Sequence, residues 1–176
     1  MYLIFKIAKK DPRFGDHRNP DAISRGVWYI WHGQKHLPEQ ERFIGSEGMP
    51  EGLTPDEVIR WMMRTKRAYD MMDGVQCKHL IVSFGEKPPW KRKKLRKVLQ
   101  KIVGFWKNRY EIYWGIHSEM TEKGPNWHLH ILLNTVDLKT GNRLNLSKKL
   151  WRKFKEETTK TWERALQSEK ESVARR

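Results

Sequence analysis

Three histidines form the most informative pattern in the sequence. His128 and His130 are one residue apart in an apolar run typical of a strand, so both side chains lie on one face. His117 ends the preceding apolar run, and an antiparallel hairpin would bring it opposite the pair. Imidazoles that converge from two strands can bind one face of a divalent cation and leave its other positions open. The alternative is that the pair is simply the polar face of a strand.

A catalytic metal at such a site favours phosphoryl transfer. The cation would coordinate a non-bridging phosphate oxygen, offset its developing charge and orient it for in-line attack. The histidines themselves supply no nucleophile for this reaction. One must therefore come from elsewhere in the chain.

The charge balance points to a polyanionic partner. The 176 residues include 36 Lys and Arg against 21 Asp and Glu, which gives a net charge of +15. Nucleic acid is the partner that this charge favours, and the alternatives are an anionic membrane surface or plain solvation. The 38% of hydrophobic residues and the nine tryptophans indicate a folded domain with an aromatic-rich core.

The sequence also bears on the cellular location of the protein and on the state of its cysteine. No stretch approaches the ~20 apolar residues that cross a bilayer, and the first residues lack a signal-peptide layout. We therefore expect a cytoplasmic protein without membrane insertion. Cys77 is the single cysteine and adjoins an apolar run, so it is expected to be a buried structural thiol.

Patterns along the chain predict an α+β domain with an antiparallel sheet. Strands are expected at 2–8, 77–84, 110–117 and 127–136, with short ones near 42–44 and 144. Helices are expected from 19–21, from the capping box at Thr54 to about Gly74, over about 91–106 and over 147–170. Segment 33–52 is predicted to be a surface excursion, and 137–142 a turn. We expect one domain over 1–176, with a C-terminal helix at 147–170 and a flexible tail at 171–176.

One predicted helix is strongly basic. Residues 90–109 contain no acid, and the polar face of this helix carries Lys91, Arg92, Lys93, Lys94, Arg96, Lys97 and Lys101. Cations on one helix face can follow a nucleic-acid backbone through its phosphates. The alternative is an ordinary solvated face.

The histidine motif and its neighbouring segments resemble the HUH endonucleases. Within them the likeness is to the conjugative relaxases, or mobilisation nucleases, of the MobA-like class. The motifs follow the order of that family: His79–Phe84, Gly115–His117, His128–Asn134, Val136-Asp137 and Thr140-Gly141. The resemblance covers most of the chain between Ile23 and Leu166. It implies a central antiparallel sheet, helices packed on one face, and a metal site on the open face.

The resemblance also implies roles for individual residues. Relaxases of this class carry their catalytic tyrosine on a helix after the first strand, and Tyr29 occupies that place. His117, His128 and His130 would then hold a divalent metal, with Mn²⁺ or Mg²⁺ suggested by the family. His79 is a candidate catalytic helper near the site. Attack by the tyrosine would leave a 5′-phosphotyrosine and a free 3′ hydroxyl.

The position of Tyr29 agrees with such a role. On a helical wheel it lies about 120° from the stripe formed by Ile23, Val27 and Ile30, which favours an accessible hydroxyl. The alternative is a surface tyrosine that packs beside Trp28. Free tyrosine ionises near pH ~10, so attack near neutrality requires a nearby cation or base.

Other tyrosines are rival nucleophiles. They are Tyr2, Tyr69, Tyr110 and Tyr113, of which Tyr69 is expected in a helix core and the last two in a strand beside the hairpin. The sequence also departs from the family pattern at Glu119, where an aspartate is common. This substitution bears on the hydrogen bonds that support the metal ligands.

The function implied by the resemblance is strand-specific nicking and rejoining of single-stranded DNA at a transfer origin of a plasmid or integrative element. Accessory relaxosome and coupling proteins are the further partners it implies. Two alternatives stay open. One is a non-catalytic protein that binds single-stranded nucleic acid, and the other is a metal-dependent nuclease without a covalent intermediate.

Overall fold

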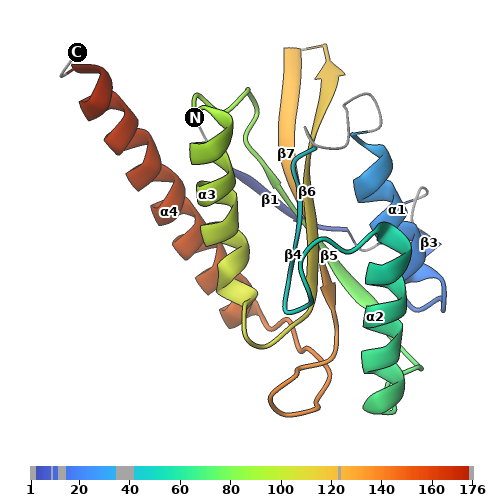
Figure 1. Cartoon of the computed structure of the whole chain (residues 1–176). Helices are drawn as coiled ribbons and strands as arrows, with labels where there is room; N and C mark the ends of the chain where they lie inside the picture. Colours follow the sequence, from blue (N-terminus) through green and yellow to red (C-terminus); the bar gives the residue numbers. More distant parts are fainter. Residues whose placement is uncertain (1–2, 9, 12–14, 35–41, 123, 175–176) are drawn as a thin grey trace. The chain divides into compact units, whose positions relative to one another are not determined.

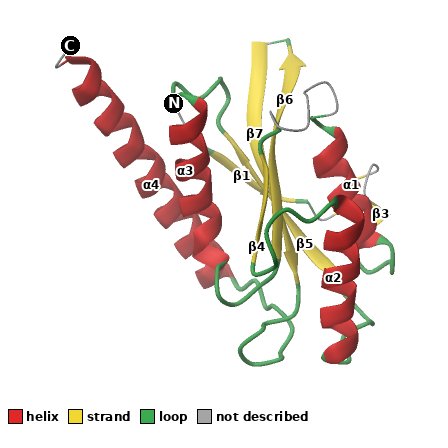
Figure 2. Cartoon of the chain, in the orientation of Figure 1, coloured by secondary structure: helices red, strands yellow, loops and turns green. Residues whose placement is uncertain are grey.

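A five-stranded antiparallel sheet in the order β1-β5-β7-β6-β4 is the centre of the fold (Figures 1 and 2). Its strands are β1 (Ile4–Ile7), β4 (Ile44–Glu47), β5 (Cys77–Ser83), β6 (Ile112–Thr121) and β7 (Gly124–Asn134). The short strands β2 (Lys10–Asp11) and β3 (Gly15–Asp16) form a separate ribbon. The helices are α1 (Ala22–His32), α2 (Pro55–Ala68), α3 (Arg92–Val103) and α4 (Lys148–Ala174). The predicted α+β class with an antiparallel sheet is confirmed.

The computed structural model describes all residues except 1–2, 9, 12–14, 35–41, 123 and 175–176. The chain forms two compact units. The sheet unit comprises Met1–Lys87 and Trp106–Leu144, and the helical unit comprises Pro88–Phe105 and Asn145–Arg176. The sheet unit holds the sheet with α1 and α2, and the helical unit holds α3 and α4. The expectation of one domain over 1–176 stays a prediction.

The predicted hairpin of β6 and β7 is present, with longer strands than expected. His117 pairs directly with His128, so it faces the two histidines of β7 as predicted. We expected a loop between His117 and Trp127, whereas the strands continue to Thr121 and Gly124. The hydroxyl of Thr121 donates to the carbonyl of Gly124 at 2.7 Å, and Gly124 adopts a φ of 104° that favours glycine. Backbone pairing therefore extends through a polar segment that lacks apolar alternation.

Alternation along β7 gives the sheet two different faces. One face carries Leu129, Ile131 and Leu133, all fully buried. The other carries His128, His130, Leu132 and Asn134, and this is the face that α1 and α2 cover in part. The Nδ2 atom of Asn134 donates to the carbonyl of Met62 in α2 at 3.1 Å.

Two glycines let α1 approach this face closely. A Cβ atom at Gly26 of α1 would lie 2.7 Å from Cδ1 of Leu132, and one at Gly115 of β6 would lie 2.7 Å from Cγ2 of Ile30. Real Cβ atoms essentially never show such contacts, so a larger residue at either position would force a shift. The buried side of α1 is therefore held against the strands that carry the histidines.

The end of α1 is also tied to the neighbouring edge strand. The side-chain amide of the buried Gln34 donates to the carbonyl of Phe43 at 3.0 Å, and its oxygen accepts from the Phe43 amide. Phe43 leads directly into β4, which pairs with β6 from Ile44 to Glu47. The predicted short strand at 42–44 thus lies two or three residues further on. Of the predicted surface excursion 33–52, residues 35–41 lie outside the described residues.

A buried polar network supports α2 on the sheet. Lys66 is fully buried, and its Nζ atom donates to the Thr135 hydroxyl at 3.0 Å. Glu111 is also buried and accepts hydrogen bonds from the hydroxyl of Thr65 and from Nδ2 of Asn134. Burial raises the pKa of Glu111, and these hydrogen bonds oppose that rise. The network makes the sheet face beneath α2 polar, although little of the network is exposed to solvent.

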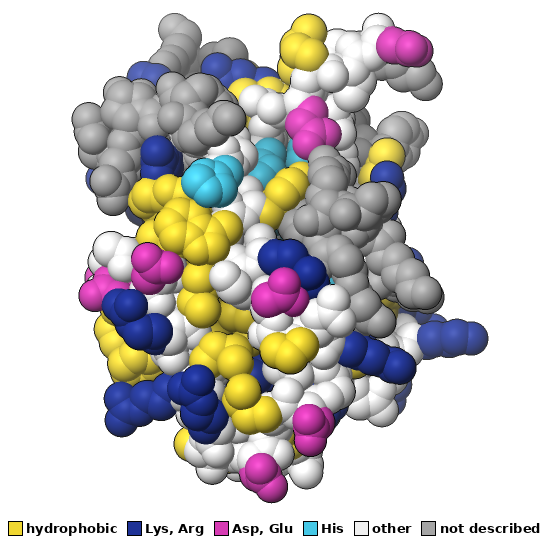
Figure 3. Space-filling model, turned by 90° about the vertical axis from the view of Figure 1, so that its right-hand side faces the viewer, with side chains coloured by type: hydrophobic (Ala, Val, Ile, Leu, Met, Phe, Trp, Pro, Cys, Tyr) yellow, Lys and Arg dark blue, Asp and Glu magenta, His cyan; other side chains and the backbone are white. Residues whose placement is uncertain are grey.

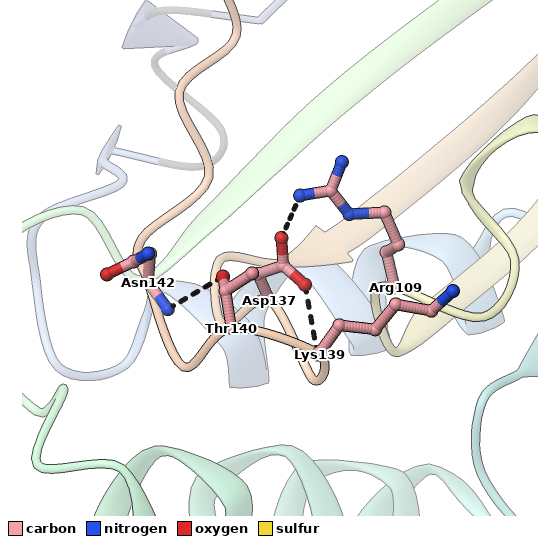
Figure 4. A network of polar contacts seen from close by, with 5 residues as sticks. All are labelled: Arg109, Asp137, Lys139, Thr140 and Asn142. Carbon is pink, nitrogen blue, oxygen red and sulfur yellow. Dashed lines mark hydrogen bonds and ion pairs between the residues drawn. The ribbon is translucent and has the colours of Figure 1, made fainter.

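The predicted turn at 137–142 is present and is held by the side chain of Asp137 (Figure 4). This carboxylate pairs with Arg109 and accepts from the backbone amide of Lys139 at 3.0 Å. Burial disfavours the charged carboxylate, but the hydrogen bonds outweigh it and lower the pKa of Asp137. The strand expected near Leu144 is only an isolated bridge between Val136 and Arg143.

The helices lie where the sequence signals predicted them, but some of their first and last residues differ from the prediction. Thr54 and Glu57 form the predicted capping box of α2, but the helix ends at Ala68 rather than near Gly74. The helix that we expected from 19–21 begins at Ala22. In the helical unit, α4 continues beyond residue 170 to Ala174, where we predicted a flexible tail. A hydrogen bond of 3.0 Å from Gln167 to Glu171, one helical turn away, supports this extension.

Lys66 should make stability depend on pH. Burial, followed by the nearby Arg143, lowers the pKa of Lys66 from 10.5 to about 8. Between these values the unfolded chain binds a proton that the folded chain has released, so the contribution of Lys66 to the free energy of unfolding rises with pH. We expect the stability of wild type relative to Lys66→Met to increase across this window in urea denaturation. Lys149→Met, at an exposed site, is the control, and a constant difference would contradict the assignment.

Candidate active site

Three buried histidines meet on the face that α1 partly covers. His117 of β6 and His128 of β7 are direct cross-strand partners, and His130 follows two residues further along β7. One ligand nitrogen from each ring lies within 4.8 Å of the others. The three side chains are only 4%, 5% and 2% exposed, respectively. The donor set is entirely imidazole, which suits a divalent transition metal.

Hydrogen bonds orient two of these rings. The Nε2 atom of His117 lies 3.0 Å from the carbonyl oxygen of Ile30. A carbonyl only accepts, so this nitrogen carries the proton of a neutral ring and Nδ1 keeps the lone pair. The Nδ1 atom of His130 lies 2.7 Å from Nε2 of His79, which leaves Nε2 of His130 for a metal. Metal-binding histidines are commonly oriented in this way through their second nitrogen. The residues present therefore fit a bound cation.

The ring of His117 occupies space that a side chain at Gly33 would fill. Gly33 caps the C-terminal end of α1, and a Cβ atom there would lie 2.1 Å from both Cε1 and Nε2 of His117. The backbone of Gly33 has φ −59°, which any residue can adopt, so the constraint is space rather than conformation. We expected Gly33 to lie in a polar surface segment, so its contact with His117 was not predicted.

Tyr29 lies beside the histidine cluster. Its ring centroid is 5.1 Å from those of His117 and His130, and 6.2 Å from that of His79. The side chain is half-buried, with part of it packed against the core. The predicted site residues of the sheet unit, Tyr29, His79 and the three histidines, are therefore brought together by the fold.

A groove opens from this cluster along the same face of the sheet. Its cavity of about 690 Å³ is bordered by Tyr29, His128 and His130 at the cluster. Further along, its lining comes from β1, β5 and the hairpin, and includes Lys6, Ser83, Glu119 and Asn126. Viewed from the side of α1 and α2, histidine side chains gather in the upper part of the molecule, some at the surface and some set deeper (Figure 3).

This arrangement refines the expected position of the site. We expected helices on one face of the sheet and the metal site on the open face. In the structure the histidines share a face with the contacts of α1, because residues two apart in β7 point the same way. The site lies where the cover of α1 ends and the open groove begins.

The rival tyrosines lie elsewhere, and none of those that the structure describes makes a ring contact with the cluster. Tyr69 caps the end of α2 and is 40% exposed, so the prediction of a core position was wrong. Tyr110 and Tyr113 are buried, and burial raises the pKa of both phenols. Tyr2 lies outside the described residues.

The seven predicted DNA-binding residues of the basic helix lie on α3 or at its start, and they differ in environment. Lys94 forms an ion pair of 2.6 Å with Glu169 of α4, and Arg96 is partly buried. Burial lowers the pKa of Arg96. The other five are exposed: Lys91, Arg92, Lys93, Lys97 and Lys101.

Two further findings concern the rest of the chain. Cys77 is buried, as predicted, and burial raises the pKa of its thiol to about 12, so the thiolate is disfavoured. Among the helices of the described residues, none combines the length and apolar character needed to cross a membrane.

Comparisons with known proteins agree with this geometry. The family model of relaxases, MobA/VirD2-like, nuclease domain, matches residues 29–165. A solved structure described as "Molecular Basis of Vancomycin Resistance Transfer in Staphylococcus aureus" aligns with a TM-score of 0.60 and 8% identity, over 96% of this chain and 94% of the other. At this identity the likeness shows a shared fold alone. A search of curated proteins finds no match. Because the family match spans most of the sequence, the chain belongs to the MobA/VirD2-like relaxases and contains their nuclease domain.

Proposed function

We propose that this relaxase nicks and rejoins one strand of DNA at the transfer origin of a plasmid or integrative element, with Tyr29 as the nucleophile. The observation that carries the proposal is the position of Tyr29, whose ring lies 5.1 Å from His117 and from His130 at the mouth of an open groove. Membership of the relaxase family supports single-stranded DNA as the substrate. The reaction takes place in the cytoplasm, where such DNA is available.

The covalent step is a transesterification. The phenolic oxygen of Tyr29 forms a bond to the scissile phosphorus while the bond from phosphorus to the 3′ oxygen breaks. The phenol proton passes to solvent through the groove, and the released 3′ oxygen takes up a proton. The product is a 5′-phosphotyrosine with a free 3′ hydroxyl, and the reverse attack rejoins the strand.

His117, His128 and His130 would hold the divalent metal, for which the family suggests Mn²⁺ or Mg²⁺. When bound, the ion supplies charge for the phosphate oxygens and a fixed point for orienting them. The residues themselves fix where the phosphate lies, because β6 and β7 position the three rings and α1 positions the phenol. Positioning of this kind lowers the barrier by reducing the freedom of the reacting groups.

His79 acts through another residue rather than on the substrate. It is fully buried, and its Nε2 atom faces the Nδ1 atom of His130 at 2.7 Å. This contact fixes the ring of His130 and directs its other nitrogen away from His79. We therefore assign His79 as a positioning residue for a metal ligand, which narrows the broader role of catalytic helper.

Tyr29→Phe should abolish the covalent product because it removes only the attacking oxygen. The assay uses single-stranded oligonucleotides that tile the DNA flanking the gene, labelled at the 3′ end, with Mn²⁺ or Mg²⁺. Wild type should form a labelled protein–DNA adduct resistant to denaturing electrophoresis, and Tyr69→Phe should behave as wild type. Cleavage that persists in Tyr29→Phe would instead indicate metal-dependent hydrolysis. Binding without cleavage by wild type would indicate a non-catalytic binder.

Gly33→Ala should weaken metal binding without unfolding the protein. The new Cβ atom would displace the ring of His117, while alanine is a better helix former than glycine. We expect the affinity for Mn²⁺ in isothermal titration to fall by about tenfold or more, while thermal melting still shows a cooperative transition. Gly104→Ala is a matched control, because Gly104 also caps a helix with φ −58° and has open space at its Cβ position. Equal affinities in both variants would refute the contact.

Replacement of His79 should separate positioning from packing. His79→Leu keeps a buried apolar side chain but loses the hydrogen bond to His130, so metal affinity should fall by roughly 10- to 100-fold. His79→Gln can restore a polar contact and should recover much of that affinity. The titration of both variants with Mn²⁺ is compared with their thermal stabilities. If Leu and Gln behave alike in metal binding, His79 has only a structural role.

A further inference from the structure

A groove within the helical unit collects positive side chains from both α3 and α4. It encloses about 320 Å³. The polar and charged residues that line it are Lys94, Lys97, Lys101, Thr161, Arg164 and Ser168. Among the described residues, the apolar lining comes from Val98 and Ala165, so the groove offers cations and hydroxyls on a small aliphatic base.

The basic side chains of this groove differ in whether an acidic partner offsets their charge. Lys94 is neutralised by its ion pair of 2.6 Å with Glu169. Among the described residues, Lys97, Lys101 and Arg164 have no hydrogen-bond or ion-pair partner. Lys97 and Lys101 are also one helical turn apart, a spacing at which like charges destabilise a helix. An anion bound between these side chains would relieve that repulsion.

Ring contacts of residues just before and just after α3 hold this helix beside α4. The rings of Trp90 and Trp162 meet edge to face with centroids 4.7 Å apart, and those of Phe105 and Phe154 do so at 5.4 Å. The ion pair between Lys94 and Glu169 adds a third link. Because these contacts join both helices, little order must be created when a ligand binds.

We propose that this groove binds backbone phosphates of DNA that lies outside the nicking groove, without reading base sequence. Lys97, Lys101 and Arg164 supply charge, and the hydroxyls of Thr161 and Ser168 can donate to phosphate oxygens. None of the described residues that line the groove is aromatic, whereas proteins that bind single strands through their bases use aromatic stacking. The inference depends on DNA as the substrate of the family and not on the chemistry of Tyr29.

An anionic membrane fits the groove less well. Helices that bind membrane surfaces combine cations with exposed large apolar side chains. The exposed large hydrophobic residues of the described chain are Ile4, Tyr69 and Met120, and all belong to the sheet unit. The helical unit thus shows the charge of a membrane-binding surface without the apolar part.

The test measures DNA binding by the full chain in a Tyr29→Phe background, so that no cleavage occurs. The groove variant combines Lys97→Gln, Lys101→Gln and Arg164→Gln. The matched control combines Lys148→Gln, Lys149→Gln and Lys160→Gln, which removes the same charge from exposed positions of α4 outside the groove lining. Affinities for a labelled duplex and a single strand of equal length are measured across a salt series. Thermal melting checks that both variants fold.

The groove variant should lose affinity by about tenfold or more and show a shallower salt dependence than the control. Removing one phosphate-binding cation lowers the slope by about 0.9 for duplex and about 0.7 for single-stranded DNA. The DNA form whose affinity falls more is the one that the groove holds. Equal decreases in both variants would overturn the proposal. Binding to vesicles of anionic lipid is measured alongside, and a defect confined to the vesicles would also overturn it.

A second measurement uses wild type and needs no variant. Duplex and single-stranded DNA are bound before brief acetylation of lysines, and the modified positions are read by mass spectrometry. Bound DNA should slow modification of Lys97 and Lys101 but not of Lys160. Uniform protection, or none at the two groove lysines, would contradict the proposal. Neither measurement requires nicking, so an inactive Tyr29 would leave this test intact.

Discussion

The close approach of α1 to the sheet is the constraint on which the site depends. Glycine at position 26 of the helix, and at 115 on the strand beneath it, removes the Cβ atoms that would hold the two apart. At Gly33 the helix end leaves room for the ring of His117, and the carbonyl of Ile30 accepts a hydrogen bond from that ring. The phenol of Tyr29 therefore comes within ring contact of the histidines. If a methyl group widened the gap between α1 and the sheet, the phenol would move away from the imidazoles.

Polar groups occupy both ends of the sheet face that α1 and α2 cover. Leu132 lies between them, with the histidine cluster on one side and Asn134 with Glu111 on the other. Burial of a polar group is costly unless it is hydrogen-bonded, and at one end hydrogen bonds from Nζ of Lys66 and Nδ2 of Asn134 offset part of this cost. At the other end the imidazoles contact His79, Ile30 and one another. These contacts fix ring orientations before any ligand arrives, which is the condition for a preorganised metal centre.

The helical unit differs from the sheet unit in the type of surface it offers. The groove beside Tyr29 combines apolar, polar and both signs of charged side chains, as suits the recognition of a particular nucleotide segment. The groove between α3 and α4 is lined by one sign of charge, which suits phosphates irrespective of sequence. Under the proposed function the first surface would hold the nicked segment, and under the further inference the second would hold the DNA around it.

The sequence by itself determined the elements and the composition of the candidate site. Strand alternation placed His128 and His130 on one face, hairpin pairing placed His117 opposite, and the capping box at Thr54 marked a helix, because these signals act between near neighbours. Only the tertiary structure decided that His79 meets His130, that β4 forms an edge, and that the site shares the face of α1. Those relations join residues far apart in sequence, such as His79 and His130, through packing. Gly33 shows most clearly what the sequence leaves undecided. It matters because it has no side chain, and the ring of His117 from another strand fills that space.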